Sequence, residues 1–239
     1  MPVKLGVNID HIATLRNARG EGHPDLLKAA HIAIKNGANS LTIHVREDQR
    51  HIKFNDAVLL KKKIKSPINL EMAPTKQMTN FAVKLKPKYA CIVPEKRREV
   101  TTEGGLNLKN KNLKTIIKKL KASRILVSLF INPEKKTIIM ANSLGVDAIE
   151  LHTGNFARAI KRKNKKLINL EFNKIKNCKI LCDKTSMKFN LGHGLDYVSA
   201  KYLMKIKRIN EFNIGHFIIG ESIFDGFGNV VKKFKKILK

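Results

Sequence analysis

Residues 25–45 read DLLKAAHIAIKNGANSLTIHV, and this stretch contains the unit from which the rest of the chain is built. Its first part, residues 25–36, carries apolar side chains at helical spacing and follows Pro24, a residue that suits the start of a helix. Gly37 then ends the helix, and residues 40–45 form a short run of β-branched and apolar residues with single polar residues between them, which is typical of a strand. The stretch therefore predicts a helix followed by a parallel strand.

The same pairing of a short apolar run with a longer amphipathic segment recurs roughly every 30 residues along the chain. The expected strands are residues 4–9, 40–45, 68–72, 89–93, 125–131, 148–151, 188–191 and 213–219. The expected helices are residues 25–36, 55–65, 76–86, 113–122, 134–144, 165–176, 197–207 and 229–238. Eight strands, each followed by a helix, in 239 residues predict an α/β chain folded as a (β/α)8 TIM barrel, with a single domain over residues 1–239.

A doubly wound parallel sheet is the alternative fold for alternating strands and helices. It favours a G-x-G-x-x-G turn after the first strand, but residues 6–11 read GVNIDH. One stretch, residues 178–182, is strand-like without fitting the alternation, because residues 188–191 make the better seventh strand. We expect residues 178–182 to be the tail of the sixth helix or a small insertion.

The composition excludes several classes of protein. A hydrophobic share of 43% is high enough for a sizeable core, so the net charge of +29 does not imply a disordered chain. No apolar run reaches the ~18 residues of a membrane span, and the first residues lack the pattern of a signal peptide. The three cysteines, Cys91, Cys178 and Cys182, form no disulfide or metal-binding pattern and suit a reducing compartment. Together these features favour a cytoplasmic protein without a membrane partner.

The positive charge suggests a nucleic-acid partner, but its make-up argues against one. Lysine supplies 38 of the 48 cations, and the basic runs are scattered through the chain instead of forming one arm. The aromatic side chains are 11 Phe and 3 Tyr, so few are available for base stacking. We therefore expect no nucleic-acid partner. A nucleic-acid-binding protein stays an alternative, and it would show steeply salt-dependent binding.

Histidine and carboxylate side chains gather where the expected strands end, which is the rim at which barrel enzymes place their chemistry. Six of the eight histidines fall at or just beyond strand ends: His11, His44, His51, His152, His193 and His216. Carboxylates at the same rim are Asp10, Glu71 and Glu150. One histidine near a strand is more often structural than catalytic, but six at a single rim indicate acid-base chemistry.

Two further sets of residues suit phosphate groups. Gly194 and Gly215 follow or lie within the last two strands, where barrels bind phosphate through backbone N–H groups. Arg19, Arg46 and Arg50 could hold a second phosphate through the planar guanidinium group. A metal centre is not expected, because the H-x-x-x-H and H-E-x-x-H spacings are absent and nearby cations would oppose a dication.

These residues together resemble the pyridoxine 5'-phosphate synthase family, whose members are barrel enzymes that close the vitamin B6 ring. The matching stretches run in order along the whole chain and are residues 6–20, 43–52, 69–73, 93–97, 99–106, 150–154, 192–195 and 213–216. The resemblance implies condensation of 1-deoxy-D-xylulose 5-phosphate with 3-amino-2-oxopropyl phosphate. The products would be pyridoxine 5'-phosphate, inorganic phosphate and water, and no cofactor would take part. Two phosphorylated substrates agree with the two expected anion sites.

The resemblance also assigns roles to single residues. It implies that His44 and Glu71 accept protons, that His193 donates one and that Glu150 stabilises a transition state. The residues implied to bind the amino ketone phosphate are Asn8, Arg19, Gly194, Gly215 and His216. The residues implied to bind deoxyxylulose phosphate are Asp10, His11, Arg46, His51 and Thr101. The family further implies a homo-octamer built from dimers, in which an arginine reaches a neighbour's site.

Some features of the chain fit the family less closely. Residues 107–124 and 156–188 are Lys-rich and depart from its pattern, but neither segment supplies an implied site residue. The polar loop at residues 96–105 is a candidate closing lid. A different barrel enzyme on phosphorylated sugars, such as an aldolase or isomerase, is the other alternative. A Schiff-base aldolase needs a buried lysine, whereas Lys4 and Lys188 open strands at the wrong end of the barrel.

Overall fold

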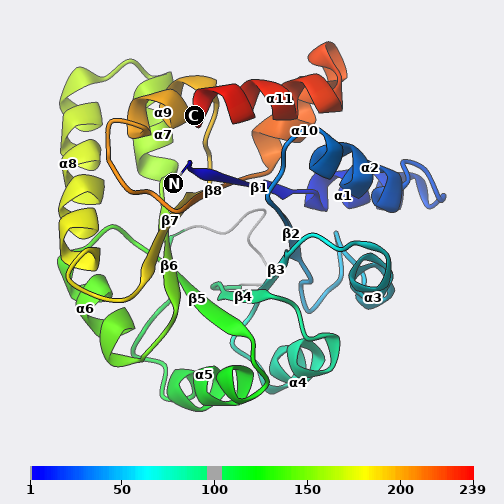
Figure 1. The fold of residues 1–239 in the computed structure, drawn as a ribbon, viewed down its shortest axis with the longest axis horizontal. Helices are drawn as coiled ribbons and strands as arrows, with labels where there is room; N and C mark the ends of the chain where they lie inside the picture. The colour runs from blue at the N-terminus through cyan, green and yellow to red at the C-terminus, as the bar shows by residue number, and fades with distance from the viewer. Residues whose placement is uncertain (1, 96–103) are drawn as a thin grey trace.

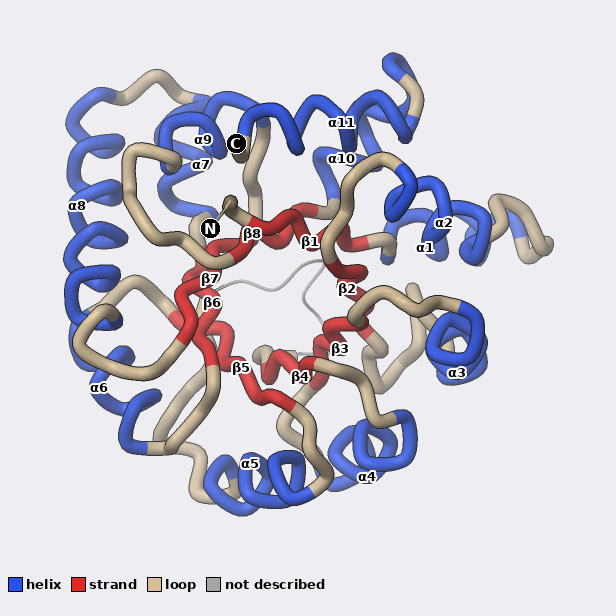
Figure 2. Tube along the Cα trace, viewed as in Figure 1, coloured by secondary structure: helices blue, strands red, loops and turns tan. Residues whose placement is uncertain are grey.

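The strands of the computed structural model close into a barrel, and the structure describes residues 2–95 and 104–239 (Figures 1 and 2). The strands are β1 (Lys4–Asn8), β2 (Ser40–His44), β3 (Ile68–Met72), β4 (Tyr89–Ile92), β5 (Leu126–Ile131), β6 (Ala148–His152), β7 (Lys188–Gly192) and β8 (Glu211–Ile214). They follow one another in sequence order, all parallel, and the pairing of Leu5 with Phe212 joins β1 to β8. The predicted (β/α)8 TIM barrel is therefore confirmed. A doubly wound fold is excluded, because its sheet does not close into a barrel.

Helices surround the barrel and cover the outer face of its strands (Figure 2). In the described part of the chain they are α1 (Asp10–Arg19), α2 (Leu26–Lys35), α3 (Phe54–Lys63), α4 (Lys76–Leu85), α5 (Leu113–Ala122), α6 (Lys135–Ser143), α7 (Gly154–Lys161), α8 (Lys165–Cys182), α9 (Tyr197–Leu203), α10 (His216–Asp225) and α11 (Phe227–Ile237). Each helix expected from the sequence has a counterpart among them. Residues 178–182 end α8, so they are the tail of a helix. None of these helices combines the length and the apolar character that a bilayer crossing needs.

Three helices were not predicted, and all three begin at the carboxyl end of a strand. They are α1 after β1, α7 after β6 and α10 after β8, with lengths of 10, 8 and 10 residues. The first turns of α1 and α10 carry the expected site residues Asp10, His11 and His216, and α7 is only 8 residues long, so none of the three gives an extended apolar period. These helices bring the expected site residues into regular structure at the rim of the barrel.

The expected eighth strand, residues 213–219, is wrong in its second half. β8 ends at Ile214, Gly215 is the residue before α10, and His216 is the first residue of that helix. The sequence Phe217-Ile218-Ile219 is apolar and partly β-branched, as strands are, but within α10 only Ile218 is fully buried. A short apolar run fits a strand and a packed helix equally well, and only the packing decides between them.

The apolar core lies between the barrel and the surrounding helices. Strand side chains that point outward, such as Leu5, Val7, Leu41 and Ile43, are completely buried. Burial of such side chains is the main favourable term in folding, at roughly 25 cal/mol per Å² of apolar surface. This core accounts for the apolar character of the strands in the sequence.

The interior of the barrel is lined by polar side chains. The Ser40 hydroxyl donates to Glu211 at 2.6 Å, and the Thr42 hydroxyl donates to Asn213 at 3.2 Å. Asn69 in turn donates to the Thr42 hydroxyl at 3.3 Å. Buried polar groups are tolerated when they are hydrogen-bonded, and these bonds join side chains from β2, β3 and β8. The polar interior continues upward into the group of residues at the carboxyl end of the barrel.

Candidate active site

The carboxyl ends of β1 and β2 are joined by the side chain of Asp10, at the start of α1. Its carboxylate accepts a hydrogen bond from the Asn8 amide at 2.7 Å and another from the backbone N–H of His44 at 2.8 Å. The Asn8 side chain accepts a bond of 2.9 Å from the backbone N–H of Asp10. Burial raises the pKa of Asp10, and the interactions with His44 and Asn8 offset part of that rise. Asn8, Asp10 and His44 are therefore brought together at the carboxyl ends of β1 and β2.

His44 ends β2 and lies between two carboxyl groups. Its Nδ1 atom is 3.8 Å from Glu71 Oε2, and its Nε2 atom is 3.5 Å from Glu95 Oε2. Burial raises the pKa of Glu71 well above its usual range, and the charges of Glu150 and Asp10 add to the rise. Burial also opposes ionisation of Glu95, but the His44 imidazole at 3.5 Å and the hydrogen bond from the Glu47 N–H outweigh it and lower the pKa of Glu95. One imidazole thus separates a carboxyl that favours its proton from one that stays ionised.

Glu150, in β6, is buried inside the barrel. Its Oε2 atom accepts a hydrogen bond of 2.5 Å from the Asn213 amide on β8. Burial raises the pKa of Glu150 to about 7; the Asn213 bond acts against this rise and the charge of Glu211 adds to it. Gly192, on β7, makes room for the carboxyl, because a Cβ at that position would lie 1.9 Å from Glu150 Oε1. The result is a carboxyl that can gain or lose a proton near neutral pH.

Three of the expected imidazoles form a second group. The ring centre of His11 lies 5.0 Å from that of His216 and 5.9 Å from that of His51. His51 Nδ1 is also 2.7 Å from the Thr14 hydroxyl. Burial, followed by the charges of His11, His44, Arg46 and Arg50, lowers the pKa of His51 to about 4, and burial followed by His216 lowers that of His11. His51 is therefore neutral near pH 7 and can take part in hydrogen bonds without adding charge.

The expected phosphate-binding glycines differ in their surroundings. Gly215 directly precedes α10, whose first backbone N–H groups and dipole suit an anion. Its hydrogen faces Asn8, since a Cβ there would lie 2.9 Å from Asn8 Cβ. Gly194 has a φ of 76° and packs against Gly154, whose Cα would be 3.5 Å from an added Cβ. The structure thus joins Gly215 to Asn8, and Gly194 to the start of α7.

The three arginines expected to bind phosphate do not lie together. Arg46 is buried, with Nε at 3.7 Å from Asp48 Oδ1 and 3.8 Å from Glu95 Oε1. Arg50 is partly exposed and its Nη2 atom is 2.6 Å from Asp48 Oδ2. Arg19 is in the last turn of α1, with its side chain 74% exposed and 3.8 Å from Glu21. Arg46 therefore belongs to the cluster around His44, whereas Arg19 faces away from it.

Thr101 and most of the candidate lid at residues 96–105 lie outside the described residues. The end of that loop is described, and there the Gly105 N–H donates to Asn132 Oδ1 at 2.8 Å. Gly105 also packs so closely that an added Cβ would lie 2.3 Å from the Asn132 backbone nitrogen. The loop is thus attached to the carboxyl end of β5 at this point.

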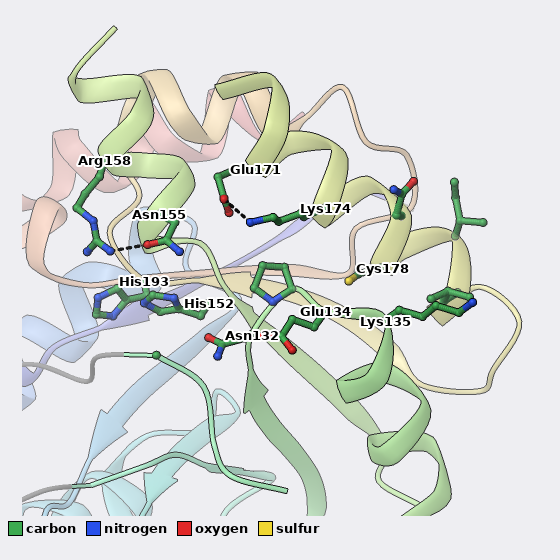
Figure 3. A pocket seen from close by; sticks show the side chains of 15 residues that line it. Asn132, Glu134, Lys135, His152, Asn155, Arg158, Glu171, Lys174, Cys178 and His193 are labelled. Carbon is green, nitrogen blue, oxygen red and sulfur yellow. Dashed lines mark hydrogen bonds and ion pairs between the residues drawn. The ribbon is translucent and has the colours of Figure 1, made fainter. Parts of the chain in front are cut away.

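His193 and His152 line a cavity of about 1050 Å³ bounded by the loop after β5, by α7 and by α8 (Figure 3). Their ring centres are 4.7 Å apart. Beside the two imidazoles Arg158 donates to Asn155, and Lys174, which also lines the cavity, pairs with Glu171 at 2.7 Å (Figure 3). The expected proton donor therefore faces a large polar cavity.

Asp10, His44 and Glu71 could also share a cation. One nitrogen or oxygen from each of the three lies within 4.8 Å of the others. The raised pKa values of Asp10 and Glu71 favour protonated carboxyls, which are poor ligands, and the Arg46 guanidinium nearby adds positive charge. The arrangement suits proton transfer better than metal binding.

Three residues of this site had no individual role assigned from the sequence: Glu95, Asn213 and His152, which was expected only as one of the six rim histidines. Glu95 approaches His44, His152 packs on His193, and Asn213 holds Glu150. Each is a polar side chain in or just after a barrel strand. A polar residue at the end of a strand was the signal that the sequence offered for them. That signal does not indicate which neighbouring side chain the residue contacts.

A closed (β/α)8 barrel with buried carboxyls and imidazoles at the carboxyl ends of its strands defines the class of the protein, a TIM-barrel enzyme. Solved structures with this fold include 3-hexulose-6-phosphate synthase, with a TM-score of 0.66, 12% identity and coverage of 99% of this chain and 100% of the other. Thiamine phosphate pyrophosphorylase from Pyrococcus furiosus has a TM-score of 0.64 and 11% identity, covering 99% and 95%. These similarities concern the fold alone.

Sequence similarity identifies the family. The model of the pyridoxal phosphate biosynthesis protein PdxJ family matches residues 5–239. The pyridoxine 5'-phosphate synthase of Pelagibacter ubique is 51% identical over 98% of each chain. That of Ehrlichia chaffeensis is 44% identical, over 99% of this chain and 97% of its own. The chain belongs to the PdxJ family, which confirms the family expected from the sequence.

Proposed function

We propose that this chain is a pyridoxine 5'-phosphate synthase with its reaction centre around His44, at the carboxyl end of the barrel. It condenses 1-deoxy-D-xylulose 5-phosphate with 3-amino-2-oxopropyl phosphate to pyridoxine 5'-phosphate, inorganic phosphate and water. Membership of the PdxJ family supports the activity. The observation that carries the location is the imidazole of His44 between Glu71 and Glu95, because it offers a base and two carboxyls of opposite protonation preference within 4 Å.

The first part of the reaction requires proton acceptors. The amine of one substrate attacks the ketone carbon of the other, and protons leave the nitrogen as the carbinolamine and then the imine form. His44 and Glu71 accept these protons in the proposed mechanism, Glu71 in its ionised form, which the raised pKa makes a stronger base. Their proximity lets one hand a proton to the other, and a general base typically contributes ~10²- to 10⁴-fold to a rate.

The later steps require a donor and a stabilising carboxyl. His193 protonates a hydroxyl group as it leaves, so that it departs as water. Glu150, with its pKa of about 7, stabilises the positive charge that develops on the nitrogen during ring closure. Condensation and dehydration move protons without a net redox change, so the proposed steps use side chains alone.

Two anion sites hold the substrates. The amino ketone phosphate is bound by Asn8, Arg19, Gly194, Gly215 and His216. Deoxyxylulose phosphate is bound by Asp10, His11, Arg46, His51 and Thr101, and Arg46 offsets charge as its phosphate is expelled. The close packing of Gly215 on Asn8 and the helix start at His216 support the first set, and the His11 and His51 rings support the second.

Assembly and location follow from the same family. The chain acts as one catalytic unit over residues 1–239 in a cytoplasmic homo-octamer built from dimers. Arg19 supports this, because it is 74% exposed at the end of α1 and so can bind the amino ketone phosphate in the site of a neighbouring subunit. Sedimentation of the purified protein tests the oligomeric state, and a monomer at micromolar concentration contradicts the proposed octamer.

The activity is tested by mixing purified protein with both phosphorylated substrates and following pyridoxine 5'-phosphate and free phosphate together. Both products appear at equal rates, and omission of either substrate abolishes them. No product from folded protein contradicts the proposal. Schiff-base trapping with borohydride tests the aldolase alternative. It leaves the chain unmodified here, since Lys4 and Lys188 begin β1 and β7 at the opposite end of the barrel.

A further inference from the structure

His193 has a backbone conformation that requires support. Its φ is 76°, in the left-handed region that a residue with a Cβ rarely adopts, and Gly194 after it also has a φ of 76°. Two consecutive left-handed residues form a tight turn immediately after β7. The direction of the His193 ring therefore depends on contacts that hold this turn from outside.

The support comes from Thr153, between β6 and α7. Its backbone N–H donates to the carbonyl of Gly192 at 2.9 Å. Its hydroxyl lies 2.7 Å from the carbonyl oxygen of Gly192 and 2.7 Å from that of His193. Thr153 is completely buried, so no water competes for these bonds. The single hydroxyl proton is shared between the two carbonyl oxygens and the backbone N–H also holds Gly192, so Thr153 fixes the two peptide groups on either side of the His193 Cα.

The ring of His193 is held by its neighbours as well. His152 precedes Thr153, and its ring centre lies 4.7 Å from that of His193 at an angle of 40°. Phe130, on β5, packs edge-on against His152 at 5.5 Å and lies 6.2 Å from His193. Figure 3 shows the two imidazoles side by side at the wall of the cavity.

Gly154 completes the contact because it lacks a side chain. A Cβ at this position would lie 2.8 Å from His152 Nε2 and 3.1 Å from His193 Cδ2. Only glycine lets the first turn of α7 approach both rings this closely. His152, Thr153 and Gly154, three consecutive residues, therefore each contact the turn or the ring of His193.

The imidazole of His152 does not carry a charge near pH 7. Burial, together with the nearby charges of His193 and Arg158, lowers the pKa of His152 to about 4. Its Nε2 atom is buried and has no hydrogen-bond partner among the described residues. His152 is therefore neutral near pH 7.

We infer that His152, Thr153 and Gly154 position His193, so that its ring points toward the substrate without His152 taking part in the chemistry. The three are positioning residues, and they act through His193. The inference rests on the proposed function, since it takes His193 as the proton donor of the synthase reaction.

The test compares matched variants of Thr153 in two backgrounds. Thr153→Val removes the hydroxyl and keeps the shape, whereas Thr153→Ser keeps the hydroxyl. Misplacement of a catalytic group typically lowers turnover by about 10- to 100-fold, so we expect a loss of this size in kcat for the valine variant, with KM values changed less than about 2-fold. The serine variant keeps kcat within about 3-fold of the parent.

The second background is His193→Asn. If Thr153 acts through His193, Thr153→Val lowers kcat no further once His193 is absent. An equal loss in both backgrounds, or equal losses in the valine and serine variants, overturns the inference. Gly154→Ala is the second variant, and it gives the same selective loss of kcat by pushing both rings even if Thr153→Val folds poorly.

An NMR experiment that does not depend on catalysis separates this inference from the proposed function. Histidine ring resonances are followed by NMR as the pH changes, with His193 assigned from the His193→Asn spectrum. We expect His152 to stay neutral down to about pH 5 and the His193 signals to shift or broaden in Thr153→Val but not in Thr153→Ser. Unchanged His193 signals in the valine variant overturn the positioning role. Full turnover of His193→Asn instead contradicts the assigned donor.

Discussion

His44 and Glu71 are register partners on the neighbouring parallel strands β2 and β3, and His44 Nδ1 lies 3.8 Å from Glu71 Oε2. Partners in register point to the same face of a sheet, and here that face is the inside of the barrel. The contact is therefore set by strand pairing, which holds both groups on rigid elements. Catalytic pairs built on strands keep their geometry more closely than pairs built on loops.

Glu71→Gln removes the carboxyl from this pair while keeping its shape. We expect kcat to fall by about 10²- to 10⁴-fold, as for loss of a general base, with an unchanged far-ultraviolet circular dichroism spectrum. Steady-state assays of pyridoxine 5'-phosphate formation measure it. Asp225→Asn, an exposed carboxyl at the end of α10, is the matched control and keeps parental turnover. Parental turnover of Glu71→Gln removes Glu71 from the base role.

Glu150→Gln should change how stability depends on pH. The pKa of Glu150 rises from its ordinary value of 4.5 to about 7 on folding, so the folded protein binds more protons between these values. The stabilisation is complete below pH 4.5 and is lost as the pH rises through about 7. At ~1.4 kcal/mol per pKa unit, the free energy of unfolding falls by roughly 3 kcal/mol from this group. Urea unfolding at several pH values measures it, and parallel pH curves for the parent and Glu150→Gln contradict it.

Gly192→Ala should disturb Glu150 without touching the substrate. The new methyl group would lie 1.9 Å from Glu150 Oε1, so the carboxyl must move away from Asn213. We expect a loss of kcat of about 10²-fold, which is typical of a misplacement of this size. Gly220→Ala is the control, because an added Cβ there meets nothing within 4 Å, and in a helix it gains about 0.5 to 1 kcal/mol of stability. Equal activity of the two variants contradicts the prediction.

Arg46→Lys tests the site for deoxyxylulose phosphate. Arginine can bind a phosphate through two parallel bonds, and lysine provides a single point charge. Loss of one charged hydrogen bond is worth about 1.5 to 3 kcal/mol, so the KM for this substrate should rise by about 10- to 100-fold. The KM for the amino ketone phosphate should stay within about 2-fold. Arg208→Lys is the control, since its side chain is 77% exposed beside Asp183. Equal rises in both KM values contradict a role of Arg46 in binding only deoxyxylulose phosphate.

The net charge of +29 should affect encounter with substrate and not the chemistry. A positive field raises the association rate of anions and is screened by salt. We therefore expect kcat/KM to fall as the salt concentration rises while kcat is unchanged. Duplex DNA at about 150 mM salt should not bind tightly, because the lysines are spread over helix exteriors. Tight binding there revives the nucleic-acid alternative.

The strands were easier to predict than the helices that follow them directly. Residues 40–45 read as a buried parallel strand because their outward side chains pack on helices and their inward ones are short, and the structure has β2 at Ser40–His44. α1 and α10 escaped prediction because site residues occupy their first turns, and α7 because it is only 8 residues long. The predicted end of the eighth strand was wrong because three apolar residues in a row, Phe217 to Ile219, are too few to distinguish the period of a helix from that of a strand.

The sequence by itself determined the barrel, the family and the chemical groups that its rim would carry. Strand order follows from the spacing of apolar runs, and each polar residue's place at a strand end is a local property. Only the tertiary structure decided which groups meet: Glu95 with His44, Asn213 with Glu150, and His152 with His193. These contacts depend on barrel closure, and the raised pKa values of Glu71 and Glu150 depend on burial. Desolvation and the approach of distant strands arise only when the whole chain has packed, so no local pattern contains them.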